Sequence, residues 1–284
     1  MKYIDLHVHS TKSDGSYTPS ELVAEAVKQG LAFFALTDHD TITGIDEAIA
    51  AAQKTALTVI PGVELSTSYH GKDIHMLGLC LDYKNTTFQK QLNYYMESRD
   101  ARNEKIYSLF KEYGIEISKK SMKEMFGDVV YTRAHMARYL LNKGYTTSIN
   151  GAFSNYIGDH GSCYVPRENI TPKQTIECIL DTGGVPILAH PLLYNLSKEN
   201  LENMVKEFKG IGMLGIEAMY STHTPSDENA LRLLAGKLDL IISGGSDFHG
   251  VNRPNVALGK GKGNLKVPMS ILDTIKSMST FMQR

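Results

Sequence analysis

The sequence predicts an α/β fold of parallel strands and crossover helices, with a small helical subdomain inserted into it. Short apolar runs alternate with helical segments in the first third of the chain and again in the last third, which is typical of βα units. The middle third has charged and aromatic helical stretches without a strand pattern. With 284 residues, 42% of them hydrophobic, the chain can bury one large core or two modest ones.

Three strands and two helices are expected in the first third. Thr18 and Glu21 form a capping box at the start of the first helix, with Pro19 at the first helical position. Because strands alternate with helices, we expect parallel strands joined by crossovers. The expected strands cover residues 3–8, 31–36 and 57–65, and the helices run from Thr18 to Gly30 and from Gly44 to Lys54.

The same alternation returns in the last third. Thr171-Pro172 and Thr224-Pro225 are helix starts in which threonine caps the helix and proline takes the first helical position. The expected strands cover residues 185–189, 213–218 and 239–243, and the helices cover residues 171–183, residues 198–208 and a segment beginning at 224.

The middle of the chain has a different character. Residues 88–113 form one long helical stretch, and shorter helical pieces follow at residues 119–126 and 134–141. We therefore predict two units, a βα scaffold and a helical insertion. The scaffold is discontinuous and covers residues 1–98 and 167–284, and the insertion covers residues 99–166.

Composition and charge restrict the class of protein. The 30 basic and 31 acidic side chains leave a net charge of −1, which argues against general binding of polyanions. Cys80, Cys163 and Cys178 are an odd, widely spaced set and do not form a disulfide framework. The polar start of the chain predicts no signal peptide, and no apolar run approaches the ~18 residues of a membrane span. We expect a cytoplasmic protein without a membrane or an obligate protein partner.

Potential metal ligands follow one strand after another. His7 and His9 are two residues apart in a strand, so both imidazoles point to the same face. In a βα barrel, functional groups project from the carboxyl ends of the strands. The nine candidates are His7, His9, Asp14, His39, Glu64, His75, His190, Asp247 and His249.

These residue types indicate which ions could bind. Imidazoles and carboxylates without a ligating cysteine pair suit manganese, iron or zinc. One ion takes about four to six ligands, so nine candidates require more than one ion, with a carboxylate as the natural bridge. Manganese is the metal we favour, with iron or zinc as alternatives. The nearby Asp5, Asp38 and Asp40 are candidates to accept the second N–H of a ligating histidine, or are turn and capping residues.

Six motifs that contain most of these candidates follow one another along the chain. They are His7-Val8-His9, Thr37-Asp38-His39-Asp40, Pro61-Gly62-Val63-Glu64, His75-Met76-Leu77-Gly78, Ala189-His190-Pro191 and Ser246-Asp247-Phe248-His249. Taken together, they resemble the motifs of the PHP (polymerase and histidinol phosphatase) family, and the resemblance extends from residue 3 to about residue 259. It implies a distorted (β/α)7 barrel with a trinuclear metal centre.

The resemblance also implies which residues would bind each ion, and none of these ligand positions is substituted in this chain. Glu64 would bridge two ions, and Asp247 and Glu64 would be essential ligands. The first ion would be held by His7, His9, Glu64 and Asp247, the second by Glu64, His75 and His190, and the third by Asp14, His39 and His249.

The charge of such a centre favours phosphate chemistry. Three carboxylates against three dications leave about three positive charges, which attract a phosphate dianion. The ions lower the pKa of a bridging water from ~15.7 toward ~7, which supplies a hydroxide nucleophile at neutral pH. We therefore expect hydrolysis of phosphate esters by a metal-bridging hydroxide, without a protein nucleophile.

One sequence motif in the predicted insertion indicates residues that could bind the substrate. Tyr131-Thr132-Arg133-Ala134-His135 resembles a T-R-x-H segment of the family branch that acts on nucleotides. Arg133 would grip a phosphate and His135 would donate to a phosphate oxygen or the leaving group. Otherwise Arg133 lies on a solvated helix face and His135 packs. Arg167 is a weaker candidate, and Arg253 either adds positive charge near the site or is solvated.

The sequence thus predicts a phosphoesterase acting on 3′,5′-bisphosphonucleosides, nucleoside monophosphates or the 5′ end of short RNA. A histidinol-phosphate phosphatase is an alternative with the same chemistry. An amidohydrolase is another, but a bridging lysine cannot be placed at a strand end. A non-catalytic metal-binding PHP module is the third, but such modules lack ligands that this chain keeps.

Overall fold

A computed structural model describes residues 3–167 and 170–283. Within these ranges eight strands form one sheet in the order β7-β6-β5-β4-β3-β2-β1-β8. The sheet curls into a nearly closed barrel because the chain after β7 returns to β1: Asp247 N donates to His7 O at 2.8 Å and His9 N to Phe248 O at 3.0 Å. The strands are β1 (Tyr3–Val8), β2 (Phe33–Leu36), β3 (Thr58–Tyr69), β4 (Lys72–Leu79), β5 (Val185–Leu188), β6 (Gly215–Tyr220), β7 (Ile241–Gly245) and β8 (Val267–Pro268).

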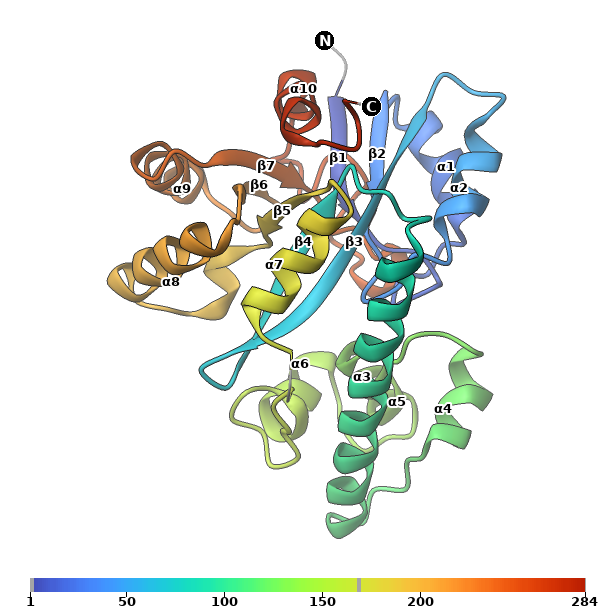
Figure 1. Ribbon diagram of the computed structural model, residues 1–284. Coiled ribbons are helices and arrows are strands. Elements are labelled where there is room, and N and C mark those ends of the chain that lie inside the picture. The colour runs from blue at the N-terminus through green and yellow to red at the C-terminus, as the bar shows by residue number, and fades with distance from the viewer. Residues whose placement is uncertain (1–2, 168–169, 284) are drawn as a thin grey trace.

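Helices surround the barrel, and the predicted α/β barrel with inserted helices is confirmed (Figure 1). No helix in the described ranges has the length and apolar character to cross a bilayer. The α-helices are α1 (Pro19–Lys28), α2 (Ile45–Ala52), α3 (Thr86–Glu112), α4 (Lys119–Phe126), α5 (Arg133–Asn142), α6 (Ile149–Ala152), α7 (Pro172–Asp181), α8 (Lys198–Ile211), α9 (Pro225–Lys237) and α10 (Met269–Met278). Three short helical turns are η1 (Phe153–Ile157), η2 (Pro191–Tyr194) and η3 (Gly250–Asn252).

The expectation of parallel strands is right for β1 to β3 and for β5 to β7, whereas β4 and β8 are strands that the sequence did not predict. β4 runs antiparallel to both β3 and β5, and β8 runs antiparallel to β1. The expected third strand ends at residue 65, whereas β3 continues to Tyr69. His70 and Gly71 then turn the chain with φ values of 48° and 76°, as the tight turn of a hairpin requires. The sequence did not predict this hairpin because the run Ser66-Thr67-Ser68, which lies within β3, is polar.

The helix α3 connects the barrel with the inserted helices. Phe88, Leu92 and Tyr95, in its first half, are buried in the barrel's hydrophobic core. Ile106 and Phe110, in its second half, belong to a separate core shared with α4 and α5. Figure 1 shows α3 leaving the barrel and running along α4 and α5 at one end of the molecule. We propose residues 99–166 as the inserted unit, although residue 99 lies within α3 itself.

Candidate metal centre

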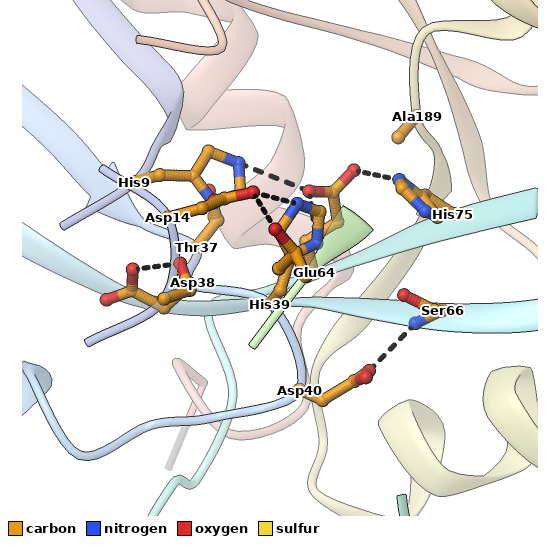
Figure 2. A network of polar contacts seen from close by, with 12 residues as sticks. His9, Asp14, Thr37, Asp38, His39, Asp40, Glu64, Ser66, His75 and Ala189 are labelled. Atoms are coloured by element: carbon orange, nitrogen blue, oxygen red, sulfur yellow. Dashed lines mark hydrogen bonds and ion pairs between the residues drawn. The ribbon is translucent and has the colours of Figure 1, made fainter. Parts of the chain in front are cut away.

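All nine candidate ligands converge at one end of the barrel. His7 lies in β1, His9 and Asp14 follow it, and His39 follows β2. His190 follows β5, and Asp247 and His249 follow β7. Figure 2 shows the side chains of His9, Asp14, His39, Glu64 and His75 pointing toward one another. Residues far apart in the sequence thus form one buried polar cluster inside a predominantly apolar barrel.

Two of the candidates lie within strands rather than at their ends. In the β3–β4 ladder Glu64 is opposite Leu77 and Ser66 is opposite His75. His75 is therefore the diagonal neighbour of Glu64 on the same face of the hairpin. The long hairpin continues past the centre, and for this reason Glu64 and His75 do not mark strand ends.

Glu64 lies at the middle of the cluster, and both of its carboxylate oxygens face imidazoles. Oε1 is 2.9 Å from His75 Nδ1 and 2.9 Å from His190 Nε2. Oε2 is 3.3 Å from His7 Nε2 and 3.1 Å from both His9 Nε2 and His39 Nδ1. Burial alone would raise the pKa of Glu64, but His39, His75 and His7 hold it well below its usual value. A carboxylate with each oxygen facing different ligands is suited to bridge two cations.

A second group gathers around Asp14. Its Oδ1 is 3.1 Å from His249 Nε2, and its Oδ2 is 3.7 Å from His39 Nε2. The hydroxyl of Thr132, from the insertion, donates to Oδ2 of Asp14 at 2.8 Å. Asp14 therefore joins the barrel loop after β1 to the start of α5.

The two oxygens of Asp247 have different surroundings. Oδ1 is 3.2 Å from His9 Nε2 and 3.5 Å from His7 Nε2. Oδ2 accepts hydrogen bonds from the hydroxyl of Tyr220, at 2.6 Å, and from the guanidinium of Arg253. Arg253 is thus an ion-pair partner of a candidate ligand rather than a solvated side chain, and only Oδ1 of Asp247 faces the cluster.

The arrangement fits several cations. Four groups of three or four ligand atoms lie within 4.8 Å of one another. Within the described residues, several buried atoms of these groups lack a hydrogen-bond partner, which is costly unless something else satisfies them. The unpartnered atoms are His7 Nε2, both ring nitrogens of His9, Asp14 Oδ1, His39 Nδ1, Glu64 Oε2 and His190 Nδ1. The four groups are His9, Asp14, His39 and His249; His7, Glu64 and His190; His7, His9 and Asp247; and His39, Glu64 and His75.

Comparison with known families agrees with this geometry. The model of the PHP domain matches residues 5–182, more than half of the chain. The chain belongs to the PHP family. A 5′-3′ exoribonuclease of Haemophilus influenzae is 38% identical over 87% of this PHP chain and 90% of its own length. A 3′,5′-nucleoside bisphosphate phosphatase of Chromobacterium violaceum is 31% identical over 88% of this chain and 88% of its own.

Solved structures share the complete PHP fold. An amidohydrolase from Chromobacterium violaceum with bound sulfate superposes with a TM-score of 0.85 at 28% identity, over 97% of this chain and 96% of that one. A protein from Bifidobacterium adolescentis described as a metal-dependent phosphoesterase gives a TM-score of 0.84 at 26% identity, over 98% and 97% of the two chains. Both cover the barrel and the inserted helices together.

One acidic residue of this PHP site, Glu217, is not among the nine candidates that the sequence indicates. It lies fully buried in β6, and its Oε1 is 3.0 Å from His7 Nδ1. Its Oε2 accepts a hydrogen bond from the backbone N–H of His190 at 2.8 Å. An ionised Glu217 accepts the Nδ1 proton of His7, which leaves the lone pair of Nε2 toward the cluster. The signal was a lone acid in the apolar strand Gly215-Ile-Glu-Ala-Met-Tyr220.

Replacing Glu217 with Gln is expected to weaken binding of divalent metal about 10- to 100-fold. The amide lacks the negative charge that fixes the tautomer of His7 and raises the basicity of its Nε2. Competition with a chelating dye measures the affinity. The matched control Glu207→Gln, whose carboxylate accepts from Tyr69 at the surface, should leave it unchanged. Equal affinity in Glu217→Gln and the wild type would show that Glu217 does not act on the metal ligands.

Asp5 and Asp38 make backbone and hydroxyl contacts instead of accepting an imidazole N–H. Asp5 accepts from Ser246 N at 2.8 Å and from Gly259 N at 2.8 Å. Asp38 accepts from the backbone N–H of Ser10 at 2.7 Å and from the hydroxyl of Ser13 at 2.6 Å. These carboxylates fix the loops that carry the candidate ligands, so of the two roles that the sequence allows, their contacts fit the turn and capping role.

Asp40 belongs to a buried ion-pair cluster. Its Oδ2 is 2.6 Å from Arg99 Nη2 and 2.6 Å from Arg167 Nη1. Its Oδ1 accepts from the backbone N–H of Ser66 at 2.9 Å, as Figure 2 shows. Arg99 lies on α3 and Arg167 follows the inserted helices. Asp40 therefore joins the loop of His39 to both ends of the insertion. Arg167, a weaker candidate for substrate binding, is instead paired with Asp40.

Arg133 and His135, the predicted substrate contacts, lie on α5 beside the cluster. Arg133 Nη2 is 3.0 Å from Asp73 Oδ2, and its Nη1 donates to Ile157 O at 3.1 Å. His135 is only 4% exposed, and burial lowers its pKa to about 4. Both residues stay candidates for substrate binding, with Arg133 held in place by Asp73.

Proposed function

We propose that this PHP protein hydrolyses phosphate esters of nucleotides, either 3′,5′-bisphosphonucleosides and nucleoside monophosphates or the 5′ end of short RNA. The chain is a metal-dependent phosphoesterase, as its similarity to phosphoesterases and its clustered ligands indicate. The observation that carries the proposal is the convergence of six histidines and two aspartates around Glu64. The two named relatives support nucleotides as the substrate class.

We propose three divalent ions, with manganese favoured, held as the sequence resemblance implies. When bound, such ions supply the Lewis acidity that makes water nucleophilic near neutral pH and the positive charge that offsets a phosphate dianion. The four ligand groups, which share His7, His9, His39 and Glu64, support more than one ion.

The protein's own groups orient this centre. Glu217 holds the Nδ1 proton of His7, and Tyr220 and Arg253 bind the oxygen of Asp247 that faces away from the cluster. Thr132 holds Asp14 from the insertion. Because these contacts are made in the free protein, the ligands need little reorganisation before the reaction. Arg133 and His135 would bind the substrate next to the centre.

The test is a parallel assay of four candidate substrates and of 4-nitrophenyl phosphate as a generic one. Manganese-loaded protein should release inorganic phosphate or nucleotide from adenosine 3′,5′-bisphosphate, AMP or 5′-phosphorylated short RNA with a higher kcat/KM than phosphate from histidinol phosphate. A preference for histidinol phosphate would reverse the substrate proposal while leaving the phosphoesterase chemistry intact. Release of neither phosphate nor nucleotide from any substrate, including 4-nitrophenyl phosphate, would contradict the function as a whole.

A further inference from the structure

Thr132 is the residue through which the insertion contacts a candidate metal ligand directly. Its hydroxyl donates to Oδ2 of Asp14 at 2.8 Å, and both residues are buried. A hydroxyl has one proton, and the shorter bond to a charged acceptor takes it, since His135 Nδ1 is farther away at 3.4 Å. The contact therefore joins the insertion to the barrel by a charge-assisted hydrogen bond that water does not reach.

This bond divides the two oxygens of Asp14 between the insertion and the cluster. Oδ1 is 3.1 Å from His249 Nε2 and has no hydrogen-bond partner within residues 3–167 and 170–283. The terminal torsion of an aspartate is broad, so a free carboxylate can turn and exchange its oxygens. The hydroxyl of Thr132 restricts that turning and leaves Oδ1 facing the cluster.

The backbone of Asp14 is fixed separately, by the barrel. Its carbonyl accepts a hydrogen bond from Asn252 Nδ2 at 2.7 Å. The next residue, Gly15, donates its backbone N–H to Ser10 O at 2.9 Å. The barrel therefore sets where the main chain of Asp14 lies, and Thr132 sets how its carboxylate is turned.

The position of Thr132 follows the position of the insertion. Its backbone N–H donates to His135 Nδ1, in the first turn of α5, at 3.2 Å. The preceding carbonyl, of Tyr131, accepts from Asn103 Nδ2 on α3 at 3.0 Å. The side chain of Tyr131 belongs to the hydrophobic core that α3, α4 and α5 share. A shift of the inserted helices relative to the barrel would therefore move the hydroxyl away from Asp14.

One of the four ligand groups depends on Asp14 for its negative charge. This group, called here the Asp14 group, consists of His9, Asp14, His39 and His249, whose ligand atoms lie within 4.8 Å of one another. Figure 2 shows Asp14 close to His9 and His39. Asp14 is the one carboxylate of the group, whereas each of the other three groups contains Glu64 or Asp247. A turned Asp14 would thus weaken the binding of a cation here more than elsewhere in the centre.

We propose that Thr132 is a positioning residue that couples the insertion to the metal ion of the Asp14 group. While Thr132 holds Oδ2, Asp14 presents Oδ1 and the group binds its ion tightly; when the insertion is displaced, the group binds the ion more weakly. By thermodynamic linkage, binding of this ion also holds the insertion against the barrel, by the same factor. The coupling rests on the metal centre of the proposed function and does not depend on the identity of the substrate.

The first test is a calorimetric titration of the chelator-stripped protein with manganese. Thr132→Val removes the hydroxyl and keeps the shape of the side chain, so one binding step should weaken about 10- to 100-fold while the other steps stay within about twofold. Thr132→Ser, which keeps the hydroxyl, should recover most of the loss. Thr146→Val is the matched control, because Thr146 lies in the same insertion and donates to Ser148 O at 3.2 Å. It should bind manganese as the wild type does.

The second test is hydrogen exchange of the backbone amides of α5, measured with and without manganese. In the wild type, manganese should slow this exchange, because the bound ion opposes displacement of the insertion. In Thr132→Val the slowing should shrink by the same factor by which the one binding step weakens, since the coupling is reciprocal. Thr146→Val should show the slowing of the wild type.

Three results would overturn the coupling and leave the proposed function standing: equal weakening of every binding step in Thr132→Val, no weakening of any step, or α5 exchange that manganese does not slow in the wild type. A wild type that hydrolyses no phosphate ester, together with selective loss of one binding step in Thr132→Val, would overturn the proposed function and support the coupling. Thermal melting identifies a variant that fails to fold. Thr132→Ala, which also lacks the hydroxyl, then replaces Thr132→Val in both measurements.

Discussion

Replacing Glu64 with Gln is expected to lower kcat/KM for phosphate release by at least about a thousandfold, or roughly 4 kcal/mol of transition-state stabilisation. Glu64 is 1% exposed, and its two oxygens face five imidazoles between them. An amide of the same size offers one weak oxygen ligand and no charge, so it cannot bridge two cations. Initial rates with 4-nitrophenyl phosphate at saturating manganese, together with metal content per chain, measure the effect.

Two variants complete this experiment. Asp247→Ala should also abolish turnover, since it removes the oxygen that faces His7 and His9. Glu177→Gln, an exposed change within an ion pair to Lys173 on α7, is the matched control and should keep the wild-type rate. If Glu64→Gln retained more than a tenth of the activity, Glu64 would not be a bridging ligand.

Replacing Asp40 with Asn is expected to reduce the free energy of unfolding by about 3–5 kcal/mol, because it leaves two buried guanidinium groups without their counter-ion. Arg99 and Arg167 both lie 2.6 Å from Asp40 Oδ2, and Arg167 is 2% exposed. Asn tolerates the left-handed backbone of Asp40, whose φ is 53°. The loss of unfolding free energy therefore measures the effect of removing the carboxylate charge alone. Chemical denaturation of the two proteins at pH 7 measures it.

Asp239→Asn is a closely matched control. Asp239 also has a left-handed backbone, with φ of 47°, but its side chain is 92% exposed in an ion pair with Lys209. The same substitution there should change stability little. Comparable losses in the two variants would contradict a special role for the buried cluster.

The effect of Asp40 should also depend on pH in a defined direction. Burial alone would raise the pKa of Asp40, but Arg167 and Arg99 hold it well below its ordinary value. A lowered folded-state pKa gives stabilisation that is complete above the unfolded-state value of about 3.9 and is lost as the pH falls through the folded-state value. The stability difference between wild type and Asp40→Asn should therefore be constant from pH 5 to 7 and shrink below about pH 4. A difference that grows in acid would contradict this assignment.

The barrel and the cluster could be predicted from local sequence patterns. His7 and His9 share a strand face because of the two-residue period, and His190 follows an apolar strand directly. The β3–β4 hairpin could not be predicted in the same way, since Ser66 to Ser68 are polar although they lie in a strand. Glu64 and His75 were nevertheless found, because Glu64 stands near the end of the expected third strand and both residues belong to motifs that resemble the PHP family.

Long-range partners were the part that the sequence could not provide. Glu217 was overlooked because an acid within an apolar strand has no local partner, and its contact with His7 joins residues 210 positions apart. For Asp40 the sequence left open a contact with a histidine or a turn and capping role, but its partners Arg99 and Arg167 come from both ends of the insertion. Each of these roles depends on tertiary contacts, which local patterns do not encode.

The most direct test of the account is to strip the protein with a chelator and titrate it with manganese, measuring bound metal per chain and phosphate release together. The account predicts an inactive stripped protein, binding of more than one ion per chain, and activity that returns as the ions bind. Full phosphatase activity in the metal-free protein, or no binding of any divalent ion by the folded chain, would contradict it.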